Sequence, residues 1–160
     1  MSGRRVELPE VDDTHRFGET LGRMLRQGDL VVLTGELGAG KTTLTQGIGE
    51  GLGVRGPVTS PTFVISRVHP STCGGPPLVH VDAYRIDGAP ELDDLDLDAA
   101  VEESVTVVEW GHGIAEGLAE DRLEVVLEAD PDNEHRVAVV TAHGGRWSDD
   151  DLVGLGGVPC

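Results

Sequence analysis

Cysteine, long apolar runs and basic residues are all scarce in this 160-residue chain. The two cysteines, Cys73 and Cys160, have no C-x-x-C spacing, so no disulfide framework is expected. No apolar run approaches the ~18–20 residues that a membrane helix needs, so the chain has no predicted membrane span. The first ten residues, MSGRRVELPE, lack the apolar segment of a secretory signal. We therefore expect a cytoplasmic protein.

Basic residues are few relative to acidic ones, with 12 Lys and Arg against 29 Asp and Glu and a net charge of −17. Nucleic-acid binding depends largely on neutralising phosphates, so this charge disfavours direct binding of tRNA or DNA. A high net charge also keeps a protein soluble. The acidic run ELDDLDLD at residues 91–98 leaves two interpretations open, a solvated surface and a docking segment for a basic partner.

Helix and strand signals alternate along the chain. A predicted helix begins at a cap formed by Asp12, Asp13 or Thr14, and it ends at Gly28. Residues 30–34, LVVLT, lack polar alternation, which indicates a strand buried on both faces, as in a parallel sheet. Other strands are predicted over residues 4–8, 63–68, 122–129 and 135–142, within 78–85 ending near Asp82, and within 105–110 ending at Glu109. A hairpin loop is predicted at 70–77 and short helical pieces within 90–102.

The glycine-rich stretch GELGAGKT, residues 35–42, matches G-x-x-x-x-G-K-[ST] in full. It follows the predicted buried strand and precedes a helix predicted to begin near Lys41. Glycines let backbone amides approach phosphates, and the helix N-terminus behind them favours an anion. Lys41 is then expected to reach the β- and γ-phosphates, and the Thr42 hydroxyl to bind Mg²⁺. We predict an α/β fold, a single-domain P-loop NTPase with a central mixed, largely parallel sheet flanked by helices.

Such a loop needs a carboxylate on a neighbouring strand to hold the metal ion or its water. Asp82 and Glu109 each follow an apolar strand, and ligands of open parallel sheets lie beyond the carboxyl ends of the strands. His80 lies two residues before Asp82 and so points the same way. For His80 a structural hydrogen bond and a catalytic role both stay open. Thr62, in Ser60-Pro61-Thr62, is equally a γ-phosphate sensor or part of an ordinary turn.

Several motifs of other P-loop proteins are missing. No N-K-x-D occurs, and the only D-x-x-G lies at residues 151–154, so guanine specificity is unsupported. No LSGGQ-like stretch of a transporter ATPase and no arginine-rich lid of a small-molecule kinase is found. These absences leave a small ATPase of another kind.

Four motifs occur in order, GELGAGKTT, VTSPTF, HVDAYR and VEW. Together they resemble the TsaE family, small bacterial ATPases required for threonylcarbamoyladenosine in tRNA. The similarity covers about residues 4–142, which predicts a P-loop ATPase domain at 1–146 and a C-terminal tail at 147–160. The resemblance implies an Mg²⁺-dependent ATPase that converts ATP to ADP while acting on a complex of TsaB and TsaD. Contact with tRNA would be indirect, through that complex.

The resemblance also implies roles for single residues. Catalysis is expected to depend on Lys41, Glu109 and Asp82, with Glu109 placing the attacking water and Asp82 closer to the metal ion. Metal ligation is expected from Thr42, Glu109 and Asp82. Nucleotide contacts are expected from Gly38, Ala39, Gly40, Lys41, Thr42, Thr43, Thr62, Asp82, Trp110, Arg136 and Thr14, the last two on the adenine side.

No arginine finger is marked in the sequence, although Arg67 and Arg85 are candidates. P-loop enzymes without one hydrolyse slowly, so we expect weak activity alone and stimulation by the partner complex. A competing hypothesis is an ATP-switched binding module whose hydrolysis is incidental. A small-molecule kinase is a third, but no acceptor pocket is marked in the sequence.

Overall fold

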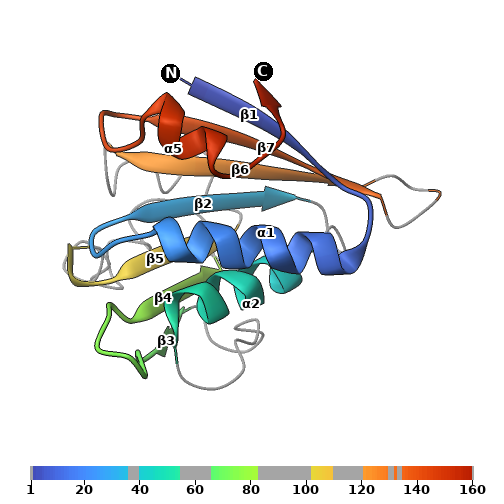
Figure 1. The fold of residues 1–160 in the computed structure, drawn as a ribbon. Helices are drawn as coiled ribbons and strands as arrows, with labels where there is room; N and C mark the ends of the chain where they lie inside the picture. Colours follow the sequence, from blue (N-terminus) through green and yellow to red (C-terminus); the bar gives the residue numbers. More distant parts are fainter. Residues whose placement is uncertain are drawn as a thin grey trace.

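A computed structural model describes residues 2–35, 40–54, 66–82, 102–109, 121–129, 132 and 135–159. Within these residues a sheet of eight strands runs in the order β3-β4-β5-β2-β6-β7-β1-β8 (Figure 1). The elements in chain order are β1 Ser2–Leu8, α1 Val11–Met24, β2 Leu30–Gly35, α2 Lys41–Leu52, β3 Ser66–His69, β4 Leu78–Asp82, β5 Val105–Glu109, β6 Arg122–Ala129, β7 Arg136–His143, α5 Asp149–Val153 and β8 Val158–Pro159. No helix in these ranges is long and apolar enough to cross a membrane.

The four central strands of the sheet are parallel. β4 pairs with β5, β5 with β2 and β2 with β6, all in parallel register. The outer pairs β3–β4, β6–β7, β7–β1 and β1–β8 are antiparallel. The predicted single-domain α/β fold with a mixed, largely parallel sheet is confirmed. The carboxyl ends of β4, β5, β2 and β6 meet at one edge of the sheet, which we call the carboxyl edge.

Helices α1 and α2 lie side by side over one face of the sheet (Figure 1). The two helices contact each other through glycines. The Cα atoms of Gly18 and Gly47 lie so close that a Cβ on either glycine would meet the other, and the same holds for Gly22 and Gly51. Beneath them is the core, to which both helices and six strands contribute. It includes Phe17, Leu21, Leu44, Ile48, Val31, Leu33, Leu78, Val107, Val125 and Val140.

The first turn of α1 differs from the prediction. The N-cap is Glu10, whereas Asp12, Asp13 or Thr14 was expected. Asp13 instead accepts a hydrogen bond from the Glu10 backbone N–H at 3.0 Å, as the third helical residue of a capping box. The helix also stops at Met24, before Gly28. Capping residues within a few positions of each other compete, and the reciprocal bonds of the capping box favour Glu10.

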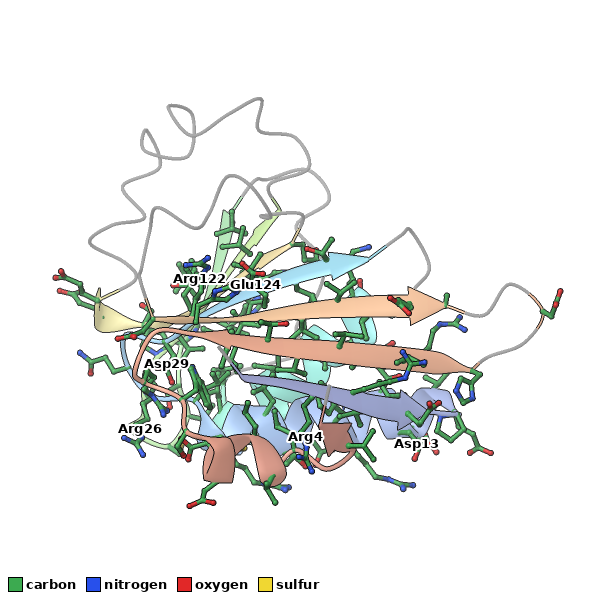
Figure 2. All side chains as sticks on the ribbon, turned by 90° about the horizontal axis from the view of Figure 1, so that it is seen from above. Arg4, Asp13, Arg26, Asp29, Arg122 and Glu124 are labelled. Atoms are coloured by element: carbon green, nitrogen blue, oxygen red, sulfur yellow. The ribbon has the colours of Figure 1, made fainter. Side chains whose placement is uncertain are left out.

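The C-terminal segment packs onto the fold. The tail was predicted to make one turn of helix before fraying; α5 is that turn, but β8 then forms and pairs with β1. Leu152 and Leu155 are buried in the core. Arg4, labelled in Figure 2, donates to the Gly156 carbonyl at 2.8 Å and so holds β8 to β1. Both ends of the chain therefore lie at the same side of the sheet (Figure 1).

Helix α5 is closed by a capping box of its own. The Ser148 backbone N–H donates to the Asp151 carboxylate at 3.0 Å, and the Asp151 N–H donates to the Ser148 hydroxyl at 3.1 Å. Hydrogen bonds to the Asp151 carboxylate, first from the Ser148 backbone N–H and then from the Ser148 side chain, lower the pKa of Asp151. The box therefore stabilises α5 at neutral pH, and this contribution is lost as the pH falls through the lowered pKa.

The other predicted elements agree with the structure where it describes them. The strands predicted at 4–8, 30–34, 105–110 and the final pair are confirmed, as is the α2 helix from Lys41. Residues 70–77 connect an antiparallel hairpin, as expected. The strand predicted at 63–68 is described only as Ser66–His69, and the helical pieces predicted within 90–102 fall almost wholly outside the described residues.

Candidate nucleotide-binding site

The glycine-rich loop leaves the carboxyl end of β2 and enters α2. Its two described ends are Gly35, in the strand, and Gly40, which has φ of +102° and caps the helix. That left-handed conformation is strained for a residue with a Cβ, so glycine is required at this turn. The central residues of the loop, Gly38 and Ala39 among them, lie outside the described residues.

Lys41 opens α2, and its side chain reaches back to the end of β2. Its Nζ donates a hydrogen bond to the Gly35 carbonyl oxygen at 2.6 Å, and the side chain is buried. A buried ammonium group is costly unless its charge is compensated. Here it lies between the strand end and the helix N-terminus, where the strand–loop–helix motif binds phosphates. The side chain is thus placed for the role predicted for it.

The first turn of α2 contains two threonines, Thr42 and Thr43. Thr42 is exposed and Thr43 is half-buried. No acidic residue lies in the first turn of the helix, so its partial positive charge is not cancelled locally. Thr42 is therefore accessible to a metal ion or a phosphate, as the prediction for it requires.

Glu109 and Asp82 end two adjacent strands. They are directly paired in the β4–β5 register, and Glu109 is also paired with Leu33 on the loop-bearing strand β2. Glu109 is 3% exposed and lies one strand from the loop. Asp82 lies one strand further away, and its side chain is outside the described set. Both acids are thus brought to the carboxyl edge, with Glu109 on the strand next to the loop.

His80 lies beside Glu109, a contact that the sequence pattern did not specify. Its Nε2 is 3.2 Å from Oε2 of Glu109, and the ring is completely buried. Alternation along β4 had placed His80 on the side of Asp82. The pairing of β4 with β5 puts it diagonally opposite Glu109 as well. The H-x-D spacing was the available signal for a role of His80 at the site. The sequence did not show that β4 pairs with the strand that carries Glu109.

Thr14 and Arg136, predicted on the adenine side, are both at the carboxyl edge. Thr14 is buried in the first turn of α1, and its Cγ2 lies 3.6 Å from where a Cβ would be on Gly40. Arg136 begins β7 and is paired with Leu8 and Ala129, which end β1 and β6. Its guanidinium group donates to the His135 carbonyl oxygen at 3.1 Å. Thr14 therefore adjoins the loop, while Arg136 is two strands beyond it.

Thr62 and Trp110, and with them the proposed switch and the tryptophan of the VEW motif, lie outside the described residues. The same holds for Arg85 and for the side chain of Arg67, the two candidates for an arginine finger. The roles of these four residues stay predictions.

The fold and the site together define a class of protein. A glycine-rich loop joins a central parallel strand to a helix, a buried lysine at the helix start bonds to the end of that strand, and a buried acid ends the next strand. This is the arrangement of a P-loop nucleotide-binding protein.

Similarity to known proteins then identifies the family. Residues 8–138 match the family model described as threonylcarbamoyl adenosine biosynthesis protein TsaE, and the chain belongs to this family. The tRNA threonylcarbamoyladenosine biosynthesis protein TsaE of Streptomyces coelicolor is 59% identical over 145 residues, which cover 88% of this chain and 98% of that protein. The protein of the same name from Mycobacterium tuberculosis is 49% identical over 143 residues, 85% of each chain.

A solved structure has the same fold. The crystal structure of YdiB from Bacillus subtilis superposes with a TM-score of 0.75 and 31% sequence identity, covering 97% of this chain and 95% of that one. The predicted resemblance to the TsaE family is confirmed.

Proposed function

We propose that this protein is an Mg²⁺-dependent ATPase that acts in the threonylcarbamoyladenosine modification of tRNA, together with TsaB and TsaD. The observation that carries the proposal is the buried Lys41 bonded to Gly35 at the end of β2, with the buried Glu109 at the end of the next strand. One charge is suited to the transferred phosphate and the other to the attacking water. The family membership supports the pathway.

The donors at the carboxyl edge suit magnesium, which prefers oxygen ligands such as hydroxyl and carboxylate groups. Thr42, Glu109 and Asp82 would hold it, directly or through its waters. When bound, Mg²⁺ would neutralise the negative charge that develops on the phosphates. No nitrogen or sulfur donor is needed for this role.

Hydrolysis would then proceed by positioning and charge stabilisation, since the protein does little covalent chemistry in phosphoryl transfer. Glu109 orients a water molecule that forms a bond to the γ-phosphorus. The bond from that phosphorus to the bridging oxygen breaks, which releases ADP and phosphate. Lys41 and the amides of the loop stabilise the charge on the phosphate oxygens. Thr14 and Arg136 would border the nucleoside.

The partner complex would supply a group that stabilises charge during hydrolysis. No finger arginine is assigned at the described part of the site, and slow hydrolysis is expected of a P-loop enzyme without one. A net charge of −17 argues against direct contact with tRNA, so tRNA would be met through the TsaB–TsaD complex in the cytoplasm.

The test is ATP turnover by the purified protein with and without TsaB and TsaD. We expect weak turnover alone and stimulation by the complex, since a group supplied in trans raises such rates by up to ~10³–10⁵-fold. A Lys41→Ala variant measured with the same complex controls for contaminating ATPases. Equal turnover with and without the partners contradicts the proposal.

The second candidate is a nucleotide-switched binding module whose hydrolysis is incidental. Single-turnover experiments on the assembled complex separate the two functions. If tRNA modification resumes only after ATP is hydrolysed, the ATPase function holds. If a non-hydrolysable analogue supports repeated modification equally well, the switch function holds.

A further inference from the structure

His80 and Glu109 form a buried pair of polar side chains. His80 is completely buried, and neither ring nitrogen has a well-aligned hydrogen bond to any residue that the structure describes. Its Nε2 is nonetheless 3.2 Å from Oε2 of Glu109, within contact distance but off the line of a good hydrogen bond. A small rotation of the carboxylate would complete that bond.

Packing alone does not account for an imidazole at this position. His80 lies two residues after Leu78 on β4, so both side chains are on the same face of the sheet. That face carries the apolar core beneath α1 and α2. Buried polar groups without partners are costly, so an apolar side chain would fill this layer at lower cost. The group that the ring nitrogen meets there is the carboxylate of Glu109.

We propose that His80 is a positioning residue for Glu109. This inference rests on the proposed ATPase function, and it assigns His80 no contact with the nucleotide. With nucleotide bound, Nε2–H donates to Oε2 of Glu109 and fixes the carboxylate, which leaves Oε1 to orient the attacking water or a water of the metal ion. A carboxylate oriented by a fixed donor does not have to search for its productive rotamer during turnover.

The contact itself is tested without nucleotide and without activity. Urea unfolding midpoints are measured for the wild type, His80→Leu, Glu109→Gln and the double variant. If the two side chains interact, the shift caused by His80→Leu differs between the wild-type and Glu109→Gln backgrounds. Identical shifts in both backgrounds overturn the contact.

The role is tested by turnover in the presence of the partner complex and by ADP binding. We expect His80→Leu to lower kcat by roughly 10–100-fold, as for other groups that orient a ligand, with ADP affinity changed less than about threefold. His80→Gln retains an amide donor near the position of Nε2 and should recover part of the rate. Added to Glu109→Gln, His80→Leu should cause no further loss, because it acts through that carboxylate.

A matched control is Thr106→Val, which replaces another buried polar side chain without a hydrogen-bond partner on β5. Thr106 alternates with Val105 and Val107, so it lies on the other sheet face from Glu109. Its turnover should match the wild type. If His80→Leu fails to fold, His80→Gln and His80→Asn carry the same comparison in both backgrounds.

Three results overturn the proposal: unchanged kcat in His80→Leu, a full multiplicative loss in the double variant, and a loss confined to ADP affinity. Absence of any turnover by the wild type overturns the ATPase function and this role with it. The unfolding experiment is then still decisive for the contact, so the two failures are distinguishable.

Discussion

At the scale of the residue, Lys41 shows how a single side chain depends on its surroundings. Its ammonium group is buried and bonded to the Gly35 carbonyl at 2.6 Å, at the mouth of the loop. Most basic residues of a protein lie in water, where their charge is screened. At this depth the charge interacts strongly with an incoming phosphate, because the local dielectric constant is low.

Lys41→Ala is therefore expected to abolish nucleotide binding or turnover. Binding is measured with a fluorescent ADP analogue and turnover by phosphate release. Arg23→Ala removes an exposed cation of α1 and is the matched control, with binding unchanged. Normal binding and turnover by the lysine variant would show that the loop acts without its ammonium group.

Glu109→Ala should separate chemistry from binding. The carboxylate is predicted to position the attacking water, and it ends the strand beside the loop without being part of it. We expect turnover to fall by roughly 10²-fold or more, the range for a positioned acid–base group, with a smaller effect on the Kd for ATP. If this variant hydrolyses ATP normally, the assignment of Glu109 is wrong and Asp82 takes its place.

At the scale of the element, the α1–α2 pair holds the phosphate loop in place. A Cβ on Gly47 would lie 2.3 Å from the His15 carbonyl oxygen and 3.0 Å from the Cα of Gly18. The two helices meet backbone to backbone, and His15 additionally contacts Glu50 across them at 3.2 Å. The N-terminus of α2 carries Lys41, so the position of the loop depends on this close approach.

Gly47→Ala is expected to force the helices apart. Overpacking of this kind costs typically about 1–3 kcal/mol, which lowers the urea midpoint. Gly145→Ala is the control, because a Cβ there meets no atom within 4 Å and should leave the midpoint near that of the wild type. Equal midpoints for the two variants would mean that the helices adapt without cost.

At the scale of the whole molecule, the C-terminal segment is tied to the start of β2. The Arg146 guanidinium group donates from Nε to Oδ1 of Asp29 at 3.0 Å and from a terminal nitrogen to Oδ2 at 3.1 Å. Asp29 is 6% exposed and also accepts a hydrogen bond from the Arg26 backbone N–H. The two residues lie near each other in Figure 2. Arg146 stacks on Trp147 as well, with its guanidinium carbon 4.2 Å from the ring centroid.

Arg146→Gln should consequently destabilise the entire fold. It leaves a buried carboxylate without its cation, which costs about 3–5 kcal/mol in comparable cases. Chemical unfolding gives the free energy, and Arg16→Gln serves as the control because its contact with Asp13 is exposed and 3.8 Å long. A loss no larger than that of the control would show that Asp29 is satisfied without Arg146.

The sequence by itself determined the local features of this protein. The apolar run at 30–34, the glycine-rich loop and the acids at 82 and 109 each depend on neighbouring residues and on the alternation of a strand, so they could be predicted. The order of the four motifs identified the family. Whether Gly38, Ala39, Thr62 and Trp110 contact the nucleotide stays a prediction, since the structure does not describe them.

Only the tertiary structure decided which distant residues meet. Four features depend on segments whose relative placement no local pattern encodes. They are the contact of His80 with Glu109, the glycine contact of α1 with α2, the Glu10 cap and the Arg146–Asp29 pair. The segment after residue 146 looked like a tail because it is short and glycine-rich, yet strand pairing with β1 and burial of two leucines hold it in place. The physical reason is that pairing and burial energies are gained only once the sheet exists, whereas helix, strand and turn preferences act within a few residues.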